Sequence, residues 1–286
     1  MRVIIIIVTF SLLSLTITLA QNYQGIVLDS TNGVAIPYVN IGIVGKNVGT
    51  VTNEKGYFSI ILDADKFYYD TIRFSIVGYQ SISFQVHEFL NSKFKTDNRI
   101  FLSPKSTLLQ EIIISASSAS GLILGNKPKS KYANAGFINN KLGHEIGSLF
   151  KVKNSPILLD SVQLDSIQLN FVKCNYEKIF LRLNVYRVID RKEENVLHEP
   201  IYISLSKSEI LARPIIDLSM YNILINSDFI VSVEIVKDLG EKGLYFYASM
   251  QSETYPALFR ETSQSSWRFL THKSKPAGIS ILAFVH

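Results

Sequence analysis

The chain has 286 residues, of which 47% are apolar and 19% are charged, and its formal net charge is +5. This composition excludes a disordered tail, and at about 100 to 200 residues per domain the length predicts two domains. The basic excess lies mainly in residues 104–135, where four lysines face one glutamate, whereas residues 21–103 carry seven basic and seven acidic side chains. Basic residues that lie mainly in a connecting segment do not form a basic patch on a folded surface, as nucleic-acid binding requires. We therefore expect no nucleic-acid partner.

Residues 1–20 have the pattern of a secretory signal peptide. Arg2 provides the positive start, an apolar stretch follows, and Thr18 and Ala20 are small residues at the −3 and −1 positions of a cleavage before Gln21. The alternative is an uncleaved membrane anchor, since about 17 largely apolar residues can just span a bilayer. No cysteine directly follows the stretch, which argues against a lipoprotein anchor. We therefore expect an exported protein of a gram-negative-type envelope, in the periplasm or at the outer membrane or cell surface.

Cys174 is the only cysteine, so no intramolecular disulfide can form and stability must come from packing. We predict that this thiol is buried and structural rather than a reactive nucleophile. Beyond Gln21 no stretch is apolar for long enough to predict a transmembrane helix.

Residues 21–103 alternate short strand-like runs with turn clusters, as a small β-sandwich does. Between the third and fourth runs, Gly56 tolerates the positive φ that a tight reversal needs, and the side chain of Asn53 can bond to the turning backbone. We expect seven strands, at residues 23–28, 38–44, 49–52, 57–62, 71–76, 81–86 and 99–102.

Four ordered motifs in this region carry a resemblance to a known family. They are residues 25–29 (GIVLD), 36–41 (IPYVNI), 49–60 (GTVTNEKGYFSI) and 70–79 (DTIRFSIVGY). Together they resemble the carboxypeptidase regulatory-like domain, which is a transthyretin-like, seven-stranded β-sandwich. The resemblance implies a domain without catalytic residues, of a type that often opens the mature chains of TonB-dependent outer-membrane transporters.

Residues 104–135 are predicted to hold one strand and a linker. Residues 109–115 look like the strand that leads from the regulatory-like domain into the plug of TonB-dependent transporters. About 170 residues remain after it, which are too few for a 22-stranded barrel. Residues 115–120 and 127–131 are rich in Ser, Ala and Lys, as linkers are.

From Gly136 the chain becomes periodic again. In residues 178–188, Leu181 and Leu183 fall on one face while Arg182 and Asn184 fall on the other, which predicts a half-buried strand. Further strands are expected at residues 144–152, 162–172, 201–205, 229–235, 244–250 and 279–285.

About eight antiparallel strands in residues 136–286 predict a jelly-roll-like β-sandwich, so the whole chain is expected to be all-β. Residues 182–186 and 216–219 weakly resemble a sandwich module that occurs beside regulatory-like domains in envelope proteins. The alternative architecture is a small outer-membrane barrel, but residues 179–181 place apolar groups on both faces of a strand, where such a barrel has a polar interior.

The histidines do not have the spacing of a zinc protease. His144-Glu145 begins like H-E-x-x-H, but Ser148 stands where the second histidine should be. The sequence also has no G-x-S-x-G turn and no complete phosphate-binding loop. We therefore expect no enzyme, no cofactor and no metal site. Two pairs of acids are expected to be solvated turn residues: Asp63 with Asp65, and Asp160 with Asp165. The alternative is that their carboxylate oxygens bind calcium.

Aromatic residues gather toward the C-terminal end, where stacking on a sugar ring is the functional interpretation and core packing the structural one. Tyr245 and Tyr247 share one face of a strand, which indicates packing, whereas Trp267 and Tyr255 lie in turn-rich sequence and are the candidate ligand-binding residues.

The leading hypothesis is a non-enzymatic envelope protein that acts as a binding or docking module for a protein or surface partner. The alternative is a carbohydrate-binding accessory protein of an outer-membrane glycan-uptake system. Both hypotheses allow a peripheral association with the outer membrane. A third interpretation is an accessory subunit of a peptidase or glycosidase with a hidden active site.

Overall fold

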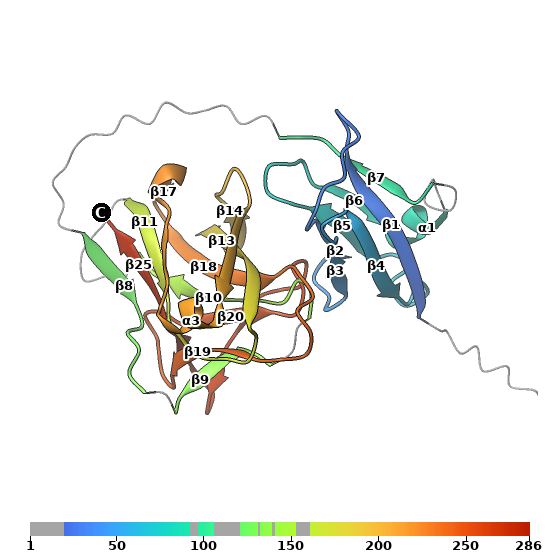
Figure 1. Ribbon diagram of the computed structural model, residues 1–286. Helices are drawn as coiled ribbons and strands as arrows, with labels where there is room; N and C mark the ends of the chain where they lie inside the picture. The colour runs from blue at the N-terminus through green and yellow to red at the C-terminus, as the bar shows by residue number, and fades with distance from the viewer. Residues whose placement is uncertain (1–19, 92–96, 106–120, 131, 139–140, 153–160) are drawn as a thin grey trace, which may run out of the picture.

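The computed structural model describes residues 20–91, 97–105, 121–130, 132–138, 141–152 and 161–286. The first nineteen residues of the predicted signal peptide, the strand predicted at residues 109–115, the linker residues 115–120 and Asp160 lie outside this part. Strands make up 52% of the structure and helices 6%, which confirms the all-β fold class. Figure 1 shows a smaller N-terminal body and a larger C-terminal one. No helix in the described ranges combines the length and apolarity needed to span a bilayer.

In the described residues, the N-terminal body is a sandwich of seven strands with the short helix α1. Its elements are β1 (Gln21–Asp29), β2 (Asn40–Ile43), β3 (Gly49–Val51), β4 (Tyr57–Leu62), β5 (Thr71–Ser75), β6 (Ile82–Gln85), α1 (Val86–Asn91) and β7 (Arg99–Leu102). One sheet has the order β4-β1-β7 and the other β3-β2-β5-β6. Strand β1 pairs antiparallel with β4 and parallel with β7. All seven predicted strands are present, and α1 is the element that the sequence pattern did not predict.

The turn between β3 and β4 forms as its residues predict. Gly56 has a φ of 74°, and a Cβ there would meet the carbonyl oxygen of Val27 at 2.9 Å. The Asn53 side-chain oxygen accepts hydrogen bonds from the backbone N–H groups of Lys55 and Tyr57. The turn carries the chain from one sheet to the other, and the backbone oxygen of Gly56 accepts from the N–H of Val27 at 2.9 Å, which joins the start of β4 to β1.

The C-terminal body is a second, larger β-sandwich. Its elements are β8 (Leu122–Gly125), β9 (Asn134–Phe137), β10 (Glu145–Phe150), β11 (Val162–Leu169), β12 (Phe171–Cys174), β13 (Lys178–Ile189), β14 (Lys192–Asn195), β15 (Ile201–Ser206), α3 (Lys207–Leu211), β16 (Ile215–Asp217), η1 (Ser219–Tyr221), β17 (Ile223–Ile225), β18 (Asp228–Ile235), β19 (Leu244–Ser249), β20 (Ala257–Arg260), β21 (Arg268–Phe269), β22 (Thr271–His272), β23 (Lys275–Pro276), β24 (Gly278–Ile279) and β25 (Ile281–Val285).

The largest sheet of this body has the order β14-β13-β18-β10-β20-β21, with β15 also paired to β13. Two further sheets, β16-β11-β25-β8 and β12-β19-β24, contribute side chains to the same core. Strand β8 lies in the segment predicted as a linker, yet it pairs antiparallel with β25 and buries Leu124. The second sandwich therefore begins before Gly136. Its likeness to a jelly roll stays a prediction.

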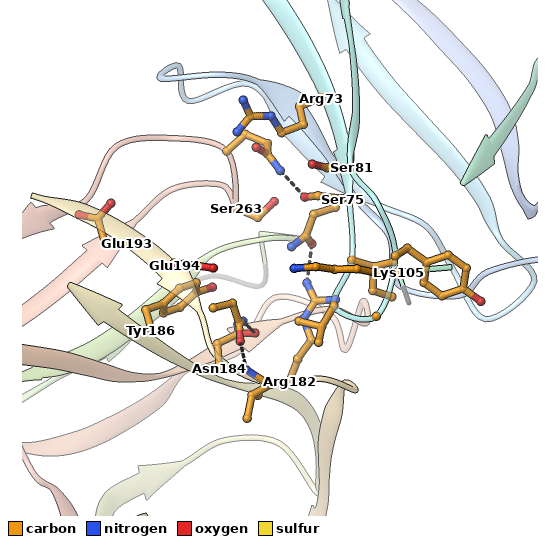
Figure 2. Close-up of a pocket in the computed structure, with 18 of the residues that line it drawn as sticks. Arg73, Ser75, Ser81, Lys105, Arg182, Asn184, Tyr186, Glu193, Glu194 and Ser263 are labelled. Atoms are coloured by element: carbon orange, nitrogen blue, oxygen red, sulfur yellow. Dashed lines mark hydrogen bonds between the residues drawn. The ribbon is translucent and has the colours of Figure 1, made fainter. Parts of the chain in front are cut away.

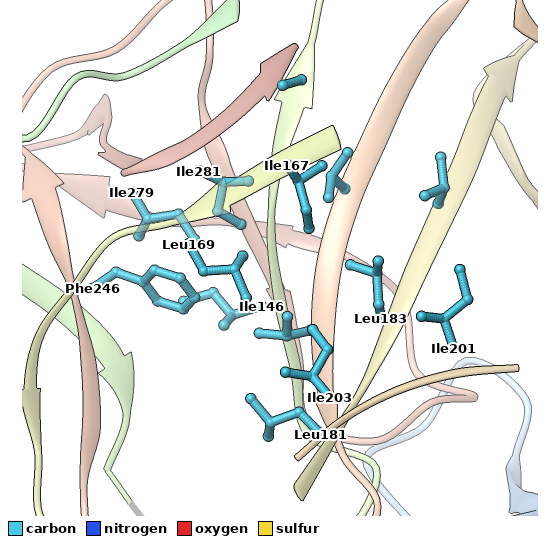
Figure 3. Packing of buried hydrophobic residues seen from close by; sticks show 14 of the residues in the cluster. Ile146, Ile167, Leu169, Leu181, Leu183, Ile201, Ile203, Phe246, Ile279 and Ile281 are labelled. Carbon is cyan, nitrogen blue, oxygen red and sulfur yellow. The ribbon is translucent and has the colours of Figure 1, made fainter. Parts of the chain in front are cut away.

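Apolar side chains from facing strands meet in the core of the second sandwich, as Figure 3 shows for Ile167 and Leu169 of β11 and for Leu181 and Leu183 of β13. Each such side chain stabilises the fold by about 1.5 to 3 kcal/mol when fully buried. Cys174 lies in this core, where burial raises the pKa of its thiol. The predicted structural role of Cys174 therefore agrees with its position.

The other face of β13 is buried as well. Arg182, Asn184 and Tyr186 are all buried, although their alternation with apolar residues predicts a solvent-facing side. The prediction of a half-buried strand is wrong because the N-terminal sandwich and the chain around Arg260 and Trp267 cover this face.

Candidate functional site

Four neighbouring strands of the large sheet place four charged residues in one row. The register pairs Arg182 of β13 with Glu234 of β18, Glu234 with Glu145 of β10, and Glu145 with Arg260 of β20. Arg182 is 1% exposed, and both glutamates are fully buried. Two carboxylates therefore stand side by side in the middle of the row, with one guanidinium on each side.

Hydrogen bonds pair these charges. Arg182 donates from Nε and Nη2 to Oε2 of Glu234, at 3.0 and 2.8 Å. Arg260 donates from Nε to Oε2 of Glu145 at 2.7 Å. Asn184 donates from Nδ2 to both carboxylates, at 2.9 Å each, and so bridges the two like charges. A buried row of this kind is stable only because every charge has a partner of opposite sign.

The pKa values follow from burial and from these partners. Burial by itself lowers the pKa of Arg260, but the carboxylate of Glu145 raises it more, so the guanidinium stays charged. Burial raises the pKa of Glu234, and Arg182 offsets part of that effect. Burial also raises the pKa of Tyr186 well above its ordinary value. Tyr186 therefore stays a phenol that accepts from Arg260 Nη2 at 2.8 Å and donates to Glu145 Oε1 at 3.2 Å.

Arg182 also joins the two sandwiches. Its Nη1 donates to the backbone oxygen of Tyr38 at 2.8 Å, and its Nη2 donates to Oδ1 of Asn40 at 2.6 Å. Tyr38 packs with Val51 and Val236 in an apolar cluster that spans both bodies. Burial, helped by the nearby Glu54 carboxylate, raises the pKa of Tyr38 to about 12.

A loop after β20 makes the second contact between the sandwiches. Gln264 donates from Nε2 to Oγ of Ser75 at 2.8 Å, and its backbone oxygen accepts from the N–H of Gly45 at 2.8 Å. The ammonium of Lys237 forms an ion pair with Glu54 at the edge of the same interface. These contacts add to those of Arg182 in holding the two bodies together.

A pocket of about 610 Å³ lies between the two sandwiches, next to the charged row (Figure 2). The N-terminal wall comes from β5, the turn after it and Lys105, and it carries the cations Arg73 and Lys105. The C-terminal wall comes from β13, β14 and the loop after β20, and it carries the carboxylates Glu193 and Glu194. Figure 2 shows the two walls facing each other. Arg182 and Arg260 also line the second wall, but both are paired with the buried glutamates, so this wall is less basic than the first.

Ser263 is a buried polar residue of the pocket wall. It is 5% exposed, and its hydroxyl has no hydrogen-bond partner among the residues that the structure describes. Buried hydroxyls are rarely left without a partner, because losing water contacts costs about 1 to 3 kcal/mol. The free hydroxyl therefore marks the pocket as a place where a ligand can supply the missing partner.

Trp267 covers the charged row. The guanidinium of Arg260 lies 4.6 Å from the centre of the Trp267 ring, and Tyr186 meets that ring edge-on at 5.9 Å. Tyr255 packs instead against Phe150, with ring centres 5.7 Å apart, at the margin of the main core. The structure does not bring Trp267 and Tyr255 together, and the described lining of the pocket contains neither. Sugar stacking by either residue stays a prediction.

The described ranges contain no group of three or more His, Cys, Asp or Glu side chains arranged to hold a metal ion. Asp63 accepts a hydrogen bond from the backbone N–H of Lys66 at 3.0 Å, as a turn residue does. Asp165 bonds to the ring of His286 at 2.7 Å. His144 lies beside Phe137, and the neighbouring Glu145 belongs to the charged row.

Sequence reasoning missed the pocket, although one signal for it was present. Arg182, Asn184 and Tyr186 alternate along a strand whose other face is strongly apolar, and each side chain has hydrogen-bonding groups that a second layer can satisfy. The partners of this polar face, Glu145 and Arg260, lie far away in the sequence. The pattern along one strand therefore could not reveal that a second layer covers it.

Comparison with known families identifies the N-terminal sandwich. Residues 23–114 match the family model of the CarboxypepD_reg-like domain. The N-terminal sandwich is therefore similar to the CarboxypepD_reg-like domain. The match confirms the resemblance seen in the four sequence motifs, and this domain type is regulatory and non-catalytic. No curated protein matches the chain. The second sandwich thus supplies the other half of a pocket whose first half belongs to the CarboxypepD_reg-like domain.

Proposed function

We propose that this is a non-enzymatic, exported binding protein of the cell envelope, in which the CarboxypepD_reg-like domain and the second sandwich form one ligand-binding unit. The observation that carries the proposal is the pocket between them, to which both bodies contribute charged side chains. Export is supported by the signal-peptide pattern of residues 1–20. The ligand belongs to the envelope or to the medium that reaches it.

The contacts between the sandwiches support a pocket that exists before the ligand arrives. Arg182 ties both walls to the buried row, and Gln264 ties the second sandwich to Ser75 of β5. A preformed site loses less conformational entropy on binding than one that must assemble around its ligand. The volume also lies within the range of small-molecule sites, about 300 to 1,000 Å³. We therefore favour a small ligand or a short segment of a larger one.

Native mass spectrometry tests this proposal directly. The chain that starts at Gln21 is incubated with small-molecule extracts of envelope material, and retained molecules are identified. Ser81→Trp places a large ring in the pocket, whereas Ser59→Trp adds the same ring to an exposed position on β4. We expect the parent and Ser59→Trp to retain a ligand that Ser81→Trp does not.

Two results contradict the proposal. One is a ligand that Ser81→Trp retains as well as the parent chain does, because that ligand binds elsewhere. The other is turnover of peptide, ester or glycoside substrates by the purified protein. Export is tested separately by the mass of the protein recovered from the envelope fraction, which begins at Gln21 if the signal peptide is removed.

The carbohydrate-binding alternative has an observation of its own. Tyr69 is 80% exposed, and beside it Tyr68 stacks on His87 with ring centres 4.7 Å apart. Exposed aromatic rings of this kind can stack on the apolar face of a pyranose. This alternative predicts glycan-array binding that disappears in Tyr69→Ala and persists in Ser81→Trp. Binding that Tyr69→Ala leaves unchanged would remove it.

A further inference from the structure

The N-terminal wall of the pocket holds two cations that lack a carboxylate partner among the described residues: Arg73 and Lys105. Arg73 uses Nε to donate to the hydroxyl of Ser83 at 3.2 Å, which leaves its terminal nitrogens for other acceptors. The backbone N–H of Lys105 donates to the oxygen of Gly78 at 2.8 Å and so fixes the base of its side chain. Arg182 and Arg260, by contrast, are neutralised by the buried glutamates.

The free hydroxyl of Ser263 is held in place by its neighbours. Ser265 Oγ donates to the backbone oxygen of Thr262 at 2.9 Å and accepts from its N–H at 3.2 Å, which closes the loop. Gln264 anchors the same loop to Ser75. The hydroxyl of Ser263 is therefore a buried donor on a fixed backbone. It lines the same pocket as Arg73 and Lys105.

The opposite wall limits the charge of the ligand. Glu194 accepts from Nε and Nη2 of Arg187, at 2.9 and 2.6 Å, and both it and Glu193 line the pocket. A phosphate monoester carries about −1.5 to −2 charges at neutral pH, so Glu193, which has no cationic partner among the described residues, repels it more than it repels a singly charged group. A carboxylate carries a single charge and matches one basic wall without meeting as large a repulsion. The remainder of the ligand must be neutral or cationic where it approaches Glu193.

We infer that the pocket binds a ligand through a single carboxylate, held by Arg73, Lys105 and the hydroxyl of Ser263. This inference rests on the proposed function and names the ligand's chemistry. A uronic-acid saccharide and an acidic peptide both supply such a group, and the pocket volume admits either as a short oligomer. Ionised acceptors form shorter and stronger hydrogen bonds than neutral ones, so the carboxylate provides most of the selectivity.

The single tryptophan gives a built-in readout. Trp267 lies against Arg260, which lines the pocket, so binding is followed by its fluorescence and by calorimetry. The probes each carry one carboxylate or none: methyl galacturonoside with its methyl ester, N-acetylglutamic acid methylamide with its glutamine counterpart, and inorganic phosphate for comparison. We expect one of the two acids to bind at least about tenfold more tightly than its neutral partner, with an affinity that falls as salt is added. Whether the uronic acid or the glutamyl compound shows this preference identifies the ligand as a saccharide or a peptide.

Variants locate the carboxylate. Lys105→Gln and Ser263→Ala are each expected to weaken binding by about tenfold, whereas Lys129→Gln, which removes an exposed charge outside the pocket, leaves it unchanged. Circular dichroism melting curves confirm that each variant is folded, and Lys105 is exposed, so its substitution does not disturb the core.

Three results overturn the inference: equal affinity for an acid and its neutral partner, tighter binding of phosphate than of either acid, or no binding of either acid. An effect of Lys129→Gln as large as that of Lys105→Gln also overturns it, because the charge then acts at long range. The proposed function fails on a different result, namely a ligand from the extracts that Ser81→Trp still retains.

Discussion

Replacing Arg182 by methionine removes four hydrogen bonds from the centre of the interface between the sandwiches. Two of them go to Glu234, one to the backbone oxygen of Tyr38 and one to Asn40. Glu234 is fully buried, and Asn184 remains as its donor. Removing one partner of a buried ion pair costs about 3 to 5 kcal/mol, so we expect Arg182→Met to lower the free energy of unfolding by that amount.

The expected loss of unfolding free energy depends on pH, and the protonation of Glu234 decides whether the loss is larger at low or at high pH. Burial holds the pKa of Glu234 above its ordinary value of 4.5, even with Arg182 beside it. A carboxyl with a raised pKa in the folded state favours folding at low pH, and that contribution is lost as the pH rises through the raised pKa. Without Arg182 the buried carboxyl can protonate, so Arg182→Met should be less destabilising at pH 5 than at pH 8.

The assay is urea unfolding of the chain from Gln21, followed by Trp267 fluorescence, which reports on the second sandwich. Arg187→Met is the matched control, because Arg187 lies on the same strand and pairs with Glu194 at an exposed site that contributes about 0 to 1 kcal/mol. The double variant Arg182→Met with Glu234→Met should recover about 2 to 3 kcal/mol of the loss. A loss no larger than that of Arg187→Met, or no recovery in the double variant, refutes the reasoning.

Three further predictions concern single sites in the second sandwich. A Cβ at Gly147 would meet the backbone oxygen of Val231 at 2.5 Å, so Gly147→Ala should lower the free energy of unfolding by about 1 to 3 kcal/mol in urea; an unchanged midpoint contradicts this. Burial lowers the pKa of His144 below 6.5, so its contribution to stability is present above pH 6.5 and lost as the pH falls. His144→Gln should therefore flatten the acid side of the melting-temperature profile, and an identical slope contradicts this. Burial raises the pKa of the Cys174 thiol, so a disulfide reagent should label it in urea but not in the native protein; rapid native labelling contradicts this.

The first sandwich could be predicted from its sequence because its signals are local. The turn at Asn53 and Gly56 and the alternation along β4 each act within a few residues, and all seven strands followed from such patterns. Helix α1 was missed because a segment of six residues is too short to show a helical periodicity. Strand β8 was missed because it has four residues and gains its stability from β25, which follows it by more than 150 positions.

The pocket could not be predicted in the same way. Period two in β13 correctly separated Leu181 and Leu183 from Arg182 and Asn184, but it cannot state what covers the polar face. The cover comes from the other sandwich and from the loop after β20, and such contacts have no local signature. The aromatic pattern directed attention to Trp267 instead, a residue that covers the buried row and that packs beside Arg260.

Hydrogen–deuterium exchange with and without bound ligand tests the central claim most directly, because it reports on both sandwiches in one measurement. The account predicts that the ligand slows exchange in residues 73–81 of the CarboxypepD_reg-like domain and, at the same concentration, in residues 193–198 and 262–264 of the second sandwich. Protection confined to one sandwich, or found only on outer strands such as β4, would contradict a site shared between them.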